Sequence, residues 1–157
     1  HGMYVRYHHD VVGVNSRLDS IQAAVLNAKL PKLDEYNAAR QLAAQKYSQA
    51  LANHKNIVTP YIAGERDSHV FHQYTLRIVD ADRDGLMQHL LDKGIPCAIY
   101  YPIPLHSQKA YLDSRYKEED FPVTNQLVKE VISLPMHTEL EDDQIQFVTD
   151  SILEFLK

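Results

Sequence analysis

Two short segments of the sequence combine residue types that could contact a phosphorylated ligand. The first, residues 13–19, places Asn15 and Arg17 at the start of a predicted helix. A helix N-terminus offers unpaired N–H groups and the positive end of the helix dipole, and both favour phosphate. An arginine adds a fork of donors that suits a diphosphate or a carboxylate. The plainer alternative is that Asn15 and Ser16 only cap the helix and that Arg17 is a surface residue.

The second segment, residues 99–106, follows a predicted strand and contains Tyr100, Tyr101 and His106. Two prolines within it favour an extended path. Loops that leave the end of a strand commonly contact ligands, so these three side chains are candidate binding residues. The alternative is an aromatic edge that only packs against a neighbouring element.

Other catalytic chemistries find little support in the residue spacing. Among nine histidines, His69 and His72 lie three apart near a predicted strand, where they would point to opposite faces. The sequence contains no CxxC, HExxH or acidic calcium-loop pattern, and no GxSxG or glycine-rich phosphate loop. Cys97 falls within a predicted buried strand, where a thiol usually acts as a small hydrophobe. We therefore expect neither a metal site nor a complete active site within this sequence.

Composition limits the class of protein. The chain has 157 residues, 45% of them hydrophobic, a formal net charge of −5 and one cysteine. This length suits one domain, and dispersed acidic charge argues against a nucleic-acid partner. We expect no membrane span and no signal peptide, and a cytoplasmic location is consistent with the single cysteine. Because the sequence opens with His1-Gly2-Met3, we expect it to be a fragment of a longer protein.

The hydrophobic periodicity predicts two N-terminal helices followed by alternating strands and helices. Capping boxes are expected at Ser16 with Asp19 and at Thr138 with Glu141. The predicted helices start at Ser16, Pro31, Asp82, Pro122 and Thr138, and the predicted strands cover residues 57–59, 72–79, 95–101 and 132–134. This order predicts an α/β (α+β) sandwich, with helices covering one face of a small sheet.

An ordered series of motifs runs along the chain. It resembles the DegT/DnrJ/StrS family of nucleotide-sugar aminotransferases over essentially the whole sequence. Each motif is weak alone, but the series is specific. The motifs are Tyr7-His8, Gly13-Val14-Asn15-Ser16-Arg17-Leu18-Asp19, His72-Gln73-Tyr74, Tyr100-Tyr101-Pro102, Pro104-Leu105-His106, Gln108 and Ser133-Leu134-Pro135-Met136-His137.

The resemblance implies a fold and an activity. It implies that residues 1–157 form the single small C-terminal domain of the aspartate-aminotransferase-like (fold type I) transferases. The large domain that holds pyridoxal phosphate on a lysine would precede it and is absent from this chain. The parent enzyme would move an amino group, from glutamate, to a nucleotide-linked keto-sugar in amino-sugar or polysaccharide biosynthesis. This chain alone is then expected to be inactive. The alternative is a non-catalytic binding or dimerisation module derived from the same family.

The resemblance also implies roles for particular residues. Asn15 would reach the pyridoxal phosphate of the neighbouring subunit in a homodimer, and Arg17 would face the phosphates of the substrate. Tyr100, Tyr101 and His106 would border the nucleotide-sugar site. No residue of this chain is expected to be catalytic. We also expect an exposed apolar face where the missing domain docks.

Overall fold

The computed structural model describes residues 2–15, 18–64 and 68–157, and its centre is a small antiparallel sheet. The sheet has the order β3-β4-β5, formed by β3 (Ile57–Val58), β4 (Tyr74–Ile78) and β5 (Val131–Leu134). Leu76 lies opposite Ile132 across the two longer strands. Along β4, Tyr74, Leu76 and Ile78 are buried, whereas the residues between them are only partly covered. This alternation is that of a strand with one face on the core.

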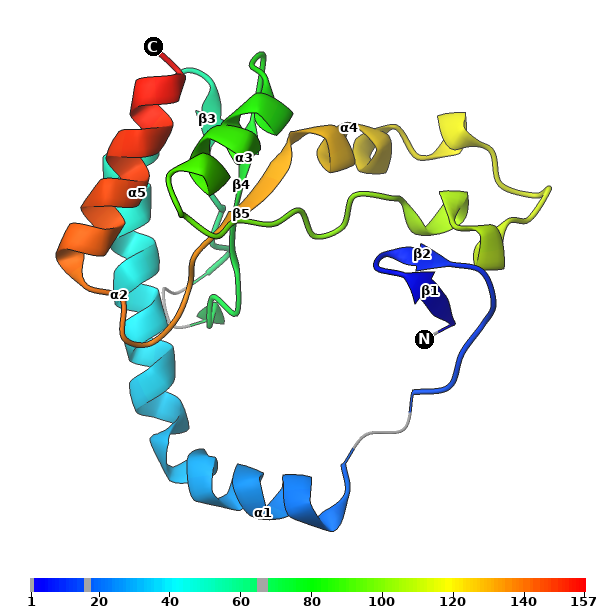
Figure 1. The fold of residues 1–157 in the computed structure, drawn as a ribbon, viewed down its shortest axis with the longest axis horizontal. Coiled ribbons are helices and arrows are strands. Elements are labelled where there is room, and N and C mark those ends of the chain that lie inside the picture. Colours follow the sequence, from blue (N-terminus) through cyan, green and yellow to red (C-terminus); the bar gives the residue numbers. More distant parts are fainter. Residues whose placement is uncertain (1, 16–17, 65–67) are drawn as a thin grey trace.

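Three helices surround the core beside this sheet: α2 (Leu33–Leu51), α3 (Arg83–Asp92) and α5 (Asp142–Phe155). Helix α5 packs against both α2 and α3 (Figure 1). Tyr47 of α2 is fully buried and lies with its ring centroid 5.1 Å from that of Tyr74. The predicted α/β architecture is therefore confirmed, and each helix that forms it carries buried apolar residues at helical spacing.

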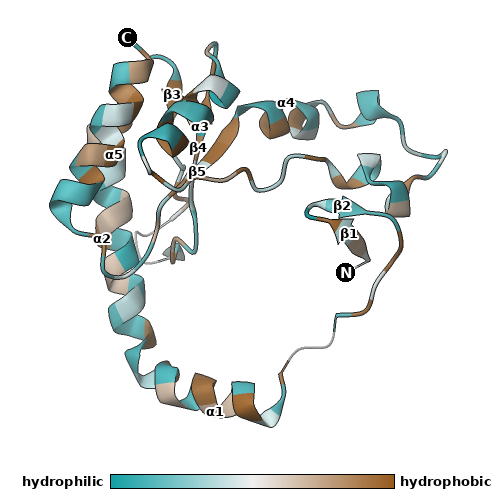
Figure 2. Cartoon of the chain, in the orientation of Figure 1, coloured by the Kyte–Doolittle hydropathy of each residue, from teal (hydrophilic) through white to brown (hydrophobic). Residues whose placement is uncertain are grey.

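The N-terminal part of the chain packs differently. Strands β1 (Met3–Val5) and β2 (His8–His9) form a hairpin that the sequence analysis did not predict. After it, α1 (Ser20–Lys29) and the 3-10 turn η1 (Leu30–Lys32) lead into α2. Helix α1 has no buried residue, although several of its residues are hydrophobic, as the brown parts of its ribbon show (Figure 2). Exposed apolar residues of the kind expected are found on α1 and at the start of η1, where Ile21 and Leu30 are 78% and 65% exposed.

A long arm connects α3 to β5. It leaves the helical body, passes the hairpin through 3-10 turns η3 (Leu105–Ser107) and η4 (Lys109–Tyr111), and turns back at η5 (Glu118–Asp120). Helix α4 (Pro122–Glu130) then returns the chain to the sheet (Figure 1). The hairpin lies beside the outward half of this arm, and β2 contacts η4.

Helix α1 begins later than predicted. Asp19 is its N-cap, with a carboxylate that accepts from the Gln22 N–H at 2.8 Å, while Gln22 Oε1 accepts from the Asp19 N–H at 3.1 Å. The predicted box of Ser16 with Asp19 is wrong, because Asp19 itself supplies the capping acceptor. Ser16 lies outside the described residues. Asn15 consequently does not sit at the helix N-terminus but five positions before its first residue, Ser20.

The last helix also begins later in the sequence than predicted. Glu141 is the N-cap of α5, and its N–H donates to Gln144 Oε1 at 3.0 Å. The predicted pairing of Thr138 with Glu141 is therefore wrong by one turn. An acidic residue can itself occupy the N-cap, and the glutamine three positions later completes the box. The helix that follows is confirmed, with Ile145, Val148 and Ile152 buried.

The strand predicted over residues 95–101 does not form. Only Ala98 pairs with the sheet, through two backbone hydrogen bonds with Ser133 of 3.1 and 2.8 Å. Pro96 has no N–H to contribute to a ladder, and beyond Ala98 the chain leaves the sheet toward the hairpin. Cys97 is half-buried rather than inside a strand, and its thiol lies 3.7 Å from the Met87 carbonyl oxygen.

The other predicted elements are confirmed close to their expected bounds. Asp82 caps α3 by accepting from the Gly85 N–H at 2.9 Å, and Gly94 follows the helix with a φ of 75°. Such a left-handed residue is where glycine normally ends a helix. Among the described helices, none is both long and apolar enough to cross a membrane.

Candidate functional site

The hairpin is attached to the arm by one buried glutamine. Gln108 is 7% exposed, its Nε2 donates to the Tyr7 carbonyl oxygen at 2.8 Å, and its Oε1 accepts from the His9 N–H at 3.1 Å. A salt bridge of 3.2 Å between Lys109 and Asp10 lies nearby. These contacts join segments 99 to 101 positions apart in the sequence. They bring the turn of the hairpin against the start of the arm.

Three aromatic rings meet at this junction, and we call them the tyrosine cluster: Tyr7, Tyr100 and Tyr101. The Tyr7 ring stands edge-on to Tyr100 at 6.4 Å and to Tyr101 at 5.9 Å, measured between ring centroids. Tyr100 and Tyr101 are 5.9 Å apart in the same edge-on geometry, and the peptide bond between them is cis. Edge-to-face pairs at these distances are attractive because ring edges and faces carry opposite partial charge. The cluster is therefore a packed unit rather than three independent side chains.

The cluster lies between two cavities. Tyr7 and Tyr101 line a largely apolar cavity of about 560 Å³, with Gln108 also in its wall. Tyr100 lines a second cavity of about 530 Å³, together with polar side chains from the hairpin, the segment before β4, β5 and the segment that follows β5. Those polar residues include Arg6, His72, Gln73, Ser133 and His137. Each volume falls within the range of small-molecule sites.

His106 occupies a third hollow, of about 440 Å³, on the outer part of the arm. Its ring stacks on Phe121 with centroids 4.3 Å apart and an interplanar angle of 16°. Its Nε2 is buried and has no hydrogen-bond partner among the described residues. Asp113 lies in the same wall, and hydrogen bonds from Arg115 hold the pKa of its carboxyl below the ordinary value. The structure thus separates His106 from the tyrosine cluster.

Asn15 stands apart from all of these side chains. It is exposed, it lines none of the three cavities, and its amide forms no hydrogen bond with another described residue. Arg17, which the sequence analysis grouped with it, lies outside the described residues. Asn15 therefore presents an unused donor to whatever lies next to this segment.

The lysine side chains do not line these three cavities. None of the nine lysines lines any of the three, and Lys46 and Lys93 are paired instead with Asp142 and Glu154. In the described parts of the chain, histidine, cysteine and acidic residues form no group of three that could hold a metal ion.

The sequence patterns singled out Tyr100 and Tyr101, which line cavities in the structure, but not Tyr7 and Gln108, which belong to the same arrangement. Neither residue belongs to a periodic pattern, because Tyr7 lies in a turn and Gln108 between two 3-10 turns. The motifs of the family resemblance include both Tyr7 and Gln108, so the resemblance was the signal that could have identified them.

Comparison with known proteins identifies the family. Residues 1–153 match the model of the DegT/DnrJ/EryC1/StrS aminotransferase family. The chain belongs to this family.

Curated relatives and solved structures agree with this assignment. The chain is 42% identical, over all of its length, to a pleiotropic regulatory protein of Geobacillus stearothermophilus, of which it covers 42%. It is also 42% identical, over 92% of its length, to UDP-N-acetyl-3-dehydro-alpha-D-glucosamine 3-aminotransferase of Acidithiobacillus ferrooxidans, of which it covers 38%.

Among solved structures, S. venezuelae DesV in complex with a ketimine intermediate matches with a TM-score of 0.82 and 36% identity. The match covers 99% of this chain and 41% of DesV. The fold is therefore that of part of a sugar aminotransferase, and the chain spans about two fifths of the length of these relatives.

Proposed function

We propose that this chain is the small C-terminal domain of a pyridoxal-phosphate-dependent aminotransferase that acts on a nucleotide-linked keto-sugar, with glutamate as amino donor. The observation that carries the proposal is the agreement in fold and sequence with DesV, which runs through 99% of this chain but covers only 41% of that enzyme. The rest of such an enzyme would be a large domain that precedes these residues. The product would serve amino-sugar or polysaccharide biosynthesis in the cytoplasm.

The placement of the lysines supports an upstream position for the cofactor-binding amine. All nine lysines lie outside the three cavities, and the amine that binds the cofactor covalently would belong to the upstream domain. Pyridoxal phosphate, when bound, acts as the electron sink that allows the amino group to move. The residues of this chain would supply contacts to the cofactor and to the sugar nucleotide.

Asn15 fits one of these contacts. Its exposed amide, unused by other described residues, can donate to a phosphate oxygen held by a neighbouring subunit. A homodimer would bring such a phosphate into reach, and Arg17 would face the phosphates of the substrate. The exposed apolar face of α1 is consistent with burial against the upstream domain or the second subunit.

The tyrosine cluster fits the substrate side. Tyr101 is 65% exposed at the edge of an apolar cavity, and Tyr100 faces the more polar one. Together they offer a sugar ring an apolar wall with hydroxyl groups at its rim. His106 would border the same substrate further along the arm.

A non-catalytic binding or dimerisation module is the second candidate. One close relative, at 42% identity, is named a pleiotropic regulatory protein rather than an aminotransferase. In that case the same cavities would bind a nucleotide sugar or a partner without chemistry.

Cofactor trapping tests the proposal. Each protein is incubated with pyridoxal phosphate and then treated with borohydride, and the modified lysine is mapped by mass spectrometry. We expect one stoichiometric adduct, upstream of residue 1, in the protein made from the complete coding sequence, and glutamate-dependent amination of a UDP- or dTDP-linked keto-sugar. We expect no stoichiometric adduct on residues 1–157. An adduct on one lysine of this chain contradicts the domain assignment, and a complete protein that holds no cofactor favours the non-catalytic module.

A further inference from the structure

The attachment of the hairpin rests on Gln108 more than on any other side chain at the junction. A buried amide is unfavourable unless its donor and acceptor are both satisfied, and here both are used on the backbone of the hairpin, at 2.8 and 3.1 Å. The neighbouring pair of Lys109 and Asp10 is largely solvent-exposed, with Lys109 at 74%. Exposed pairs of this kind contribute little. Gln108 is therefore the contact that decides where the hairpin sits.

Tyr7 depends on this attachment. Its hydroxyl is buried and has no hydrogen-bond partner among the described residues, and the charged group at its ring is the Arg6 guanidinium from the same hairpin, 4.8 Å from the ring centroid. Its backbone has a φ of 68°, in the left-handed region that bulky residues rarely adopt. A conformation of this kind persists only where surrounding contacts hold it. The Gln108 amide, bound to the Tyr7 carbonyl oxygen, is such a contact.

We propose that Gln108 is a positioning residue of the substrate site. By holding Tyr7 edge-on against Tyr100 and Tyr101, it keeps these two rings in one orientation at the cavity walls. A nucleotide-linked sugar then binds to a preformed surface, and the entropic cost of ordering these side chains on binding is avoided. This inference rests on the proposed function, because it takes the tyrosine cluster as a border of the nucleotide-sugar site.

The binding test uses this chain with UDP-N-acetylglucosamine and dTDP-glucose as probes. In Gln108→Glu, the carboxylate can still accept from the His9 N–H but cannot donate to the Tyr7 carbonyl oxygen. We expect its Kd for the tighter probe, measured by titration calorimetry, to rise about tenfold, the effect of losing one buried hydrogen bond. Gln49→Glu, at an exposed position on α2, introduces the same charge and serves as the control with unchanged Kd.

Substitutions of Tyr7 separate the ring from its hydroxyl. Tyr7→Phe should leave Kd within about twofold, because the hydroxyl has no partner to lose. Tyr7→Leu removes the edge-on contacts and should weaken binding about as much as Gln108→Glu. Hydrogen exchange provides a second measurement. In Gln108→Glu the amides of the hairpin should exchange faster, whereas those of β4 should not, which shows that the core is intact.

Kinetics distinguish positioning from general stability. In the protein made from the complete coding sequence, Gln108→Glu should raise KM for the nucleotide sugar and leave kcat and KM for glutamate unchanged. A purely structural role would lower kcat and Tm together. An unchanged Kd in Gln108→Glu overturns the inference, as does a wild-type chain that binds neither probe. A complete protein that binds the sugar nucleotide but transfers no amino group refutes the proposed function and leaves the role of Gln108 standing.

Discussion

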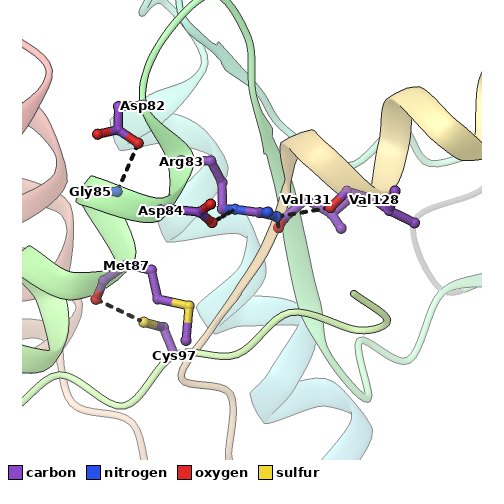
Figure 3. A network of polar contacts seen from close by, with 8 residues as sticks. All are labelled: Asp82, Arg83, Asp84, Gly85, Met87, Cys97, Val128 and Val131. Carbon is purple, nitrogen blue, oxygen red and sulfur yellow. Dashed lines mark hydrogen bonds and ion pairs between the residues drawn. The ribbon is translucent and has the colours of Figure 1, made fainter. Parts of the chain in front are cut away.

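Arg83 provides the sharpest test of how the arm is held to the core. Its Nη1 donates to the carbonyl oxygens of Val128 at 3.2 Å and Val131 at 2.7 Å, and its Nε lies 2.7 Å from Asp84 Oδ1 (Figure 3). The last carbonyl groups of a helix lack partners within the helix, and Val128 is in the last turn of α4. Arg83 thus closes the end of α4 from a different helix. The helix so fixed carries Val128 into the wall of the cavity beside Tyr101.

The expected magnitude follows from burial. The Arg83 side chain is only 10% exposed, so little solvent is available to replace it. Each charge-assisted hydrogen bond contributes about 1.5–3 kcal/mol, and Arg83→Met should lower the free energy of unfolding by about 2–4 kcal/mol. The pair with Asp84 adds little, because that carboxylate is 79% exposed. Asp84→Asn should therefore cost less than about 1 kcal/mol.

Urea unfolding followed by circular dichroism measures both variants. Arg83→Met should lower the midpoint with an unchanged m-value, since the surface exposed on unfolding is the same. Arg115→Met removes an arginine that is 74% exposed, and serves as the control with almost no effect. A loss below about 1 kcal/mol for Arg83→Met would refute the reasoning, because two buried charged hydrogen bonds cannot be so weak.

Three further expectations concern titration, reactivity and the apolar face. Burial raises the pKa of Tyr74 from 10.0 to about 12, and raises the pKa of Tyr47 further still. Both tyrosines bind their protons more tightly when folded, so the stability they contribute is complete below pH 10 and falls as pH rises toward 12. Tyr74→Phe should flatten this alkaline loss in urea midpoints measured across that range, and an unchanged slope contradicts the assignment. Burial also raises the pKa of the Cys97 thiol, so iodoacetamide should modify it more slowly in the folded chain than in urea, and equal rates would oppose this. Combining Ile21→Asp with Leu30→Asp, both on exposed positions, should reduce self-association in sedimentation and change stability by less than about 1 kcal/mol, whereas a larger loss would mean that α1 packs against this chain.

Local patterns in the sequence predicted most of the helical body. The alternation along β4 and the helical spacing of Ile145, Val148 and Ile152 both reported the buried face correctly. Asp82 and Gly94 marked the two ends of α3, because capping and left-handed backbone depend on a few adjacent residues. Such features need no knowledge of the rest of the chain.

Predictions failed where the hydrogen-bond partner lies far away in the sequence. The apolar run after Ile95 had the composition of a strand, yet only Ala98 finds a partner, in Ser133. The cap of α1 was misplaced at Ser16 because several acceptors near the helix start have suitable chemistry, and which of them caps depends on the path of the chain before it. In both cases the residue types suited the predicted element, but the predicted hydrogen-bond pairing was not the one that forms.

The residues of the candidate site also fall into two groups, those that the sequence indicated and those that only the tertiary structure brought together. The sequence by itself indicated that Tyr100 and Tyr101 are candidate binding residues that follow an apolar segment, and the family resemblance implied the class of ligand they would contact. Only the tertiary structure decided that Tyr7 joins them and that His106 does not. The physical reason is that hydrophobic periodicity reports which face of one helix or strand is buried, but not which distant segment packs against it. The bonds from Gln108 to a hairpin about a hundred residues earlier exist only once the two segments have met.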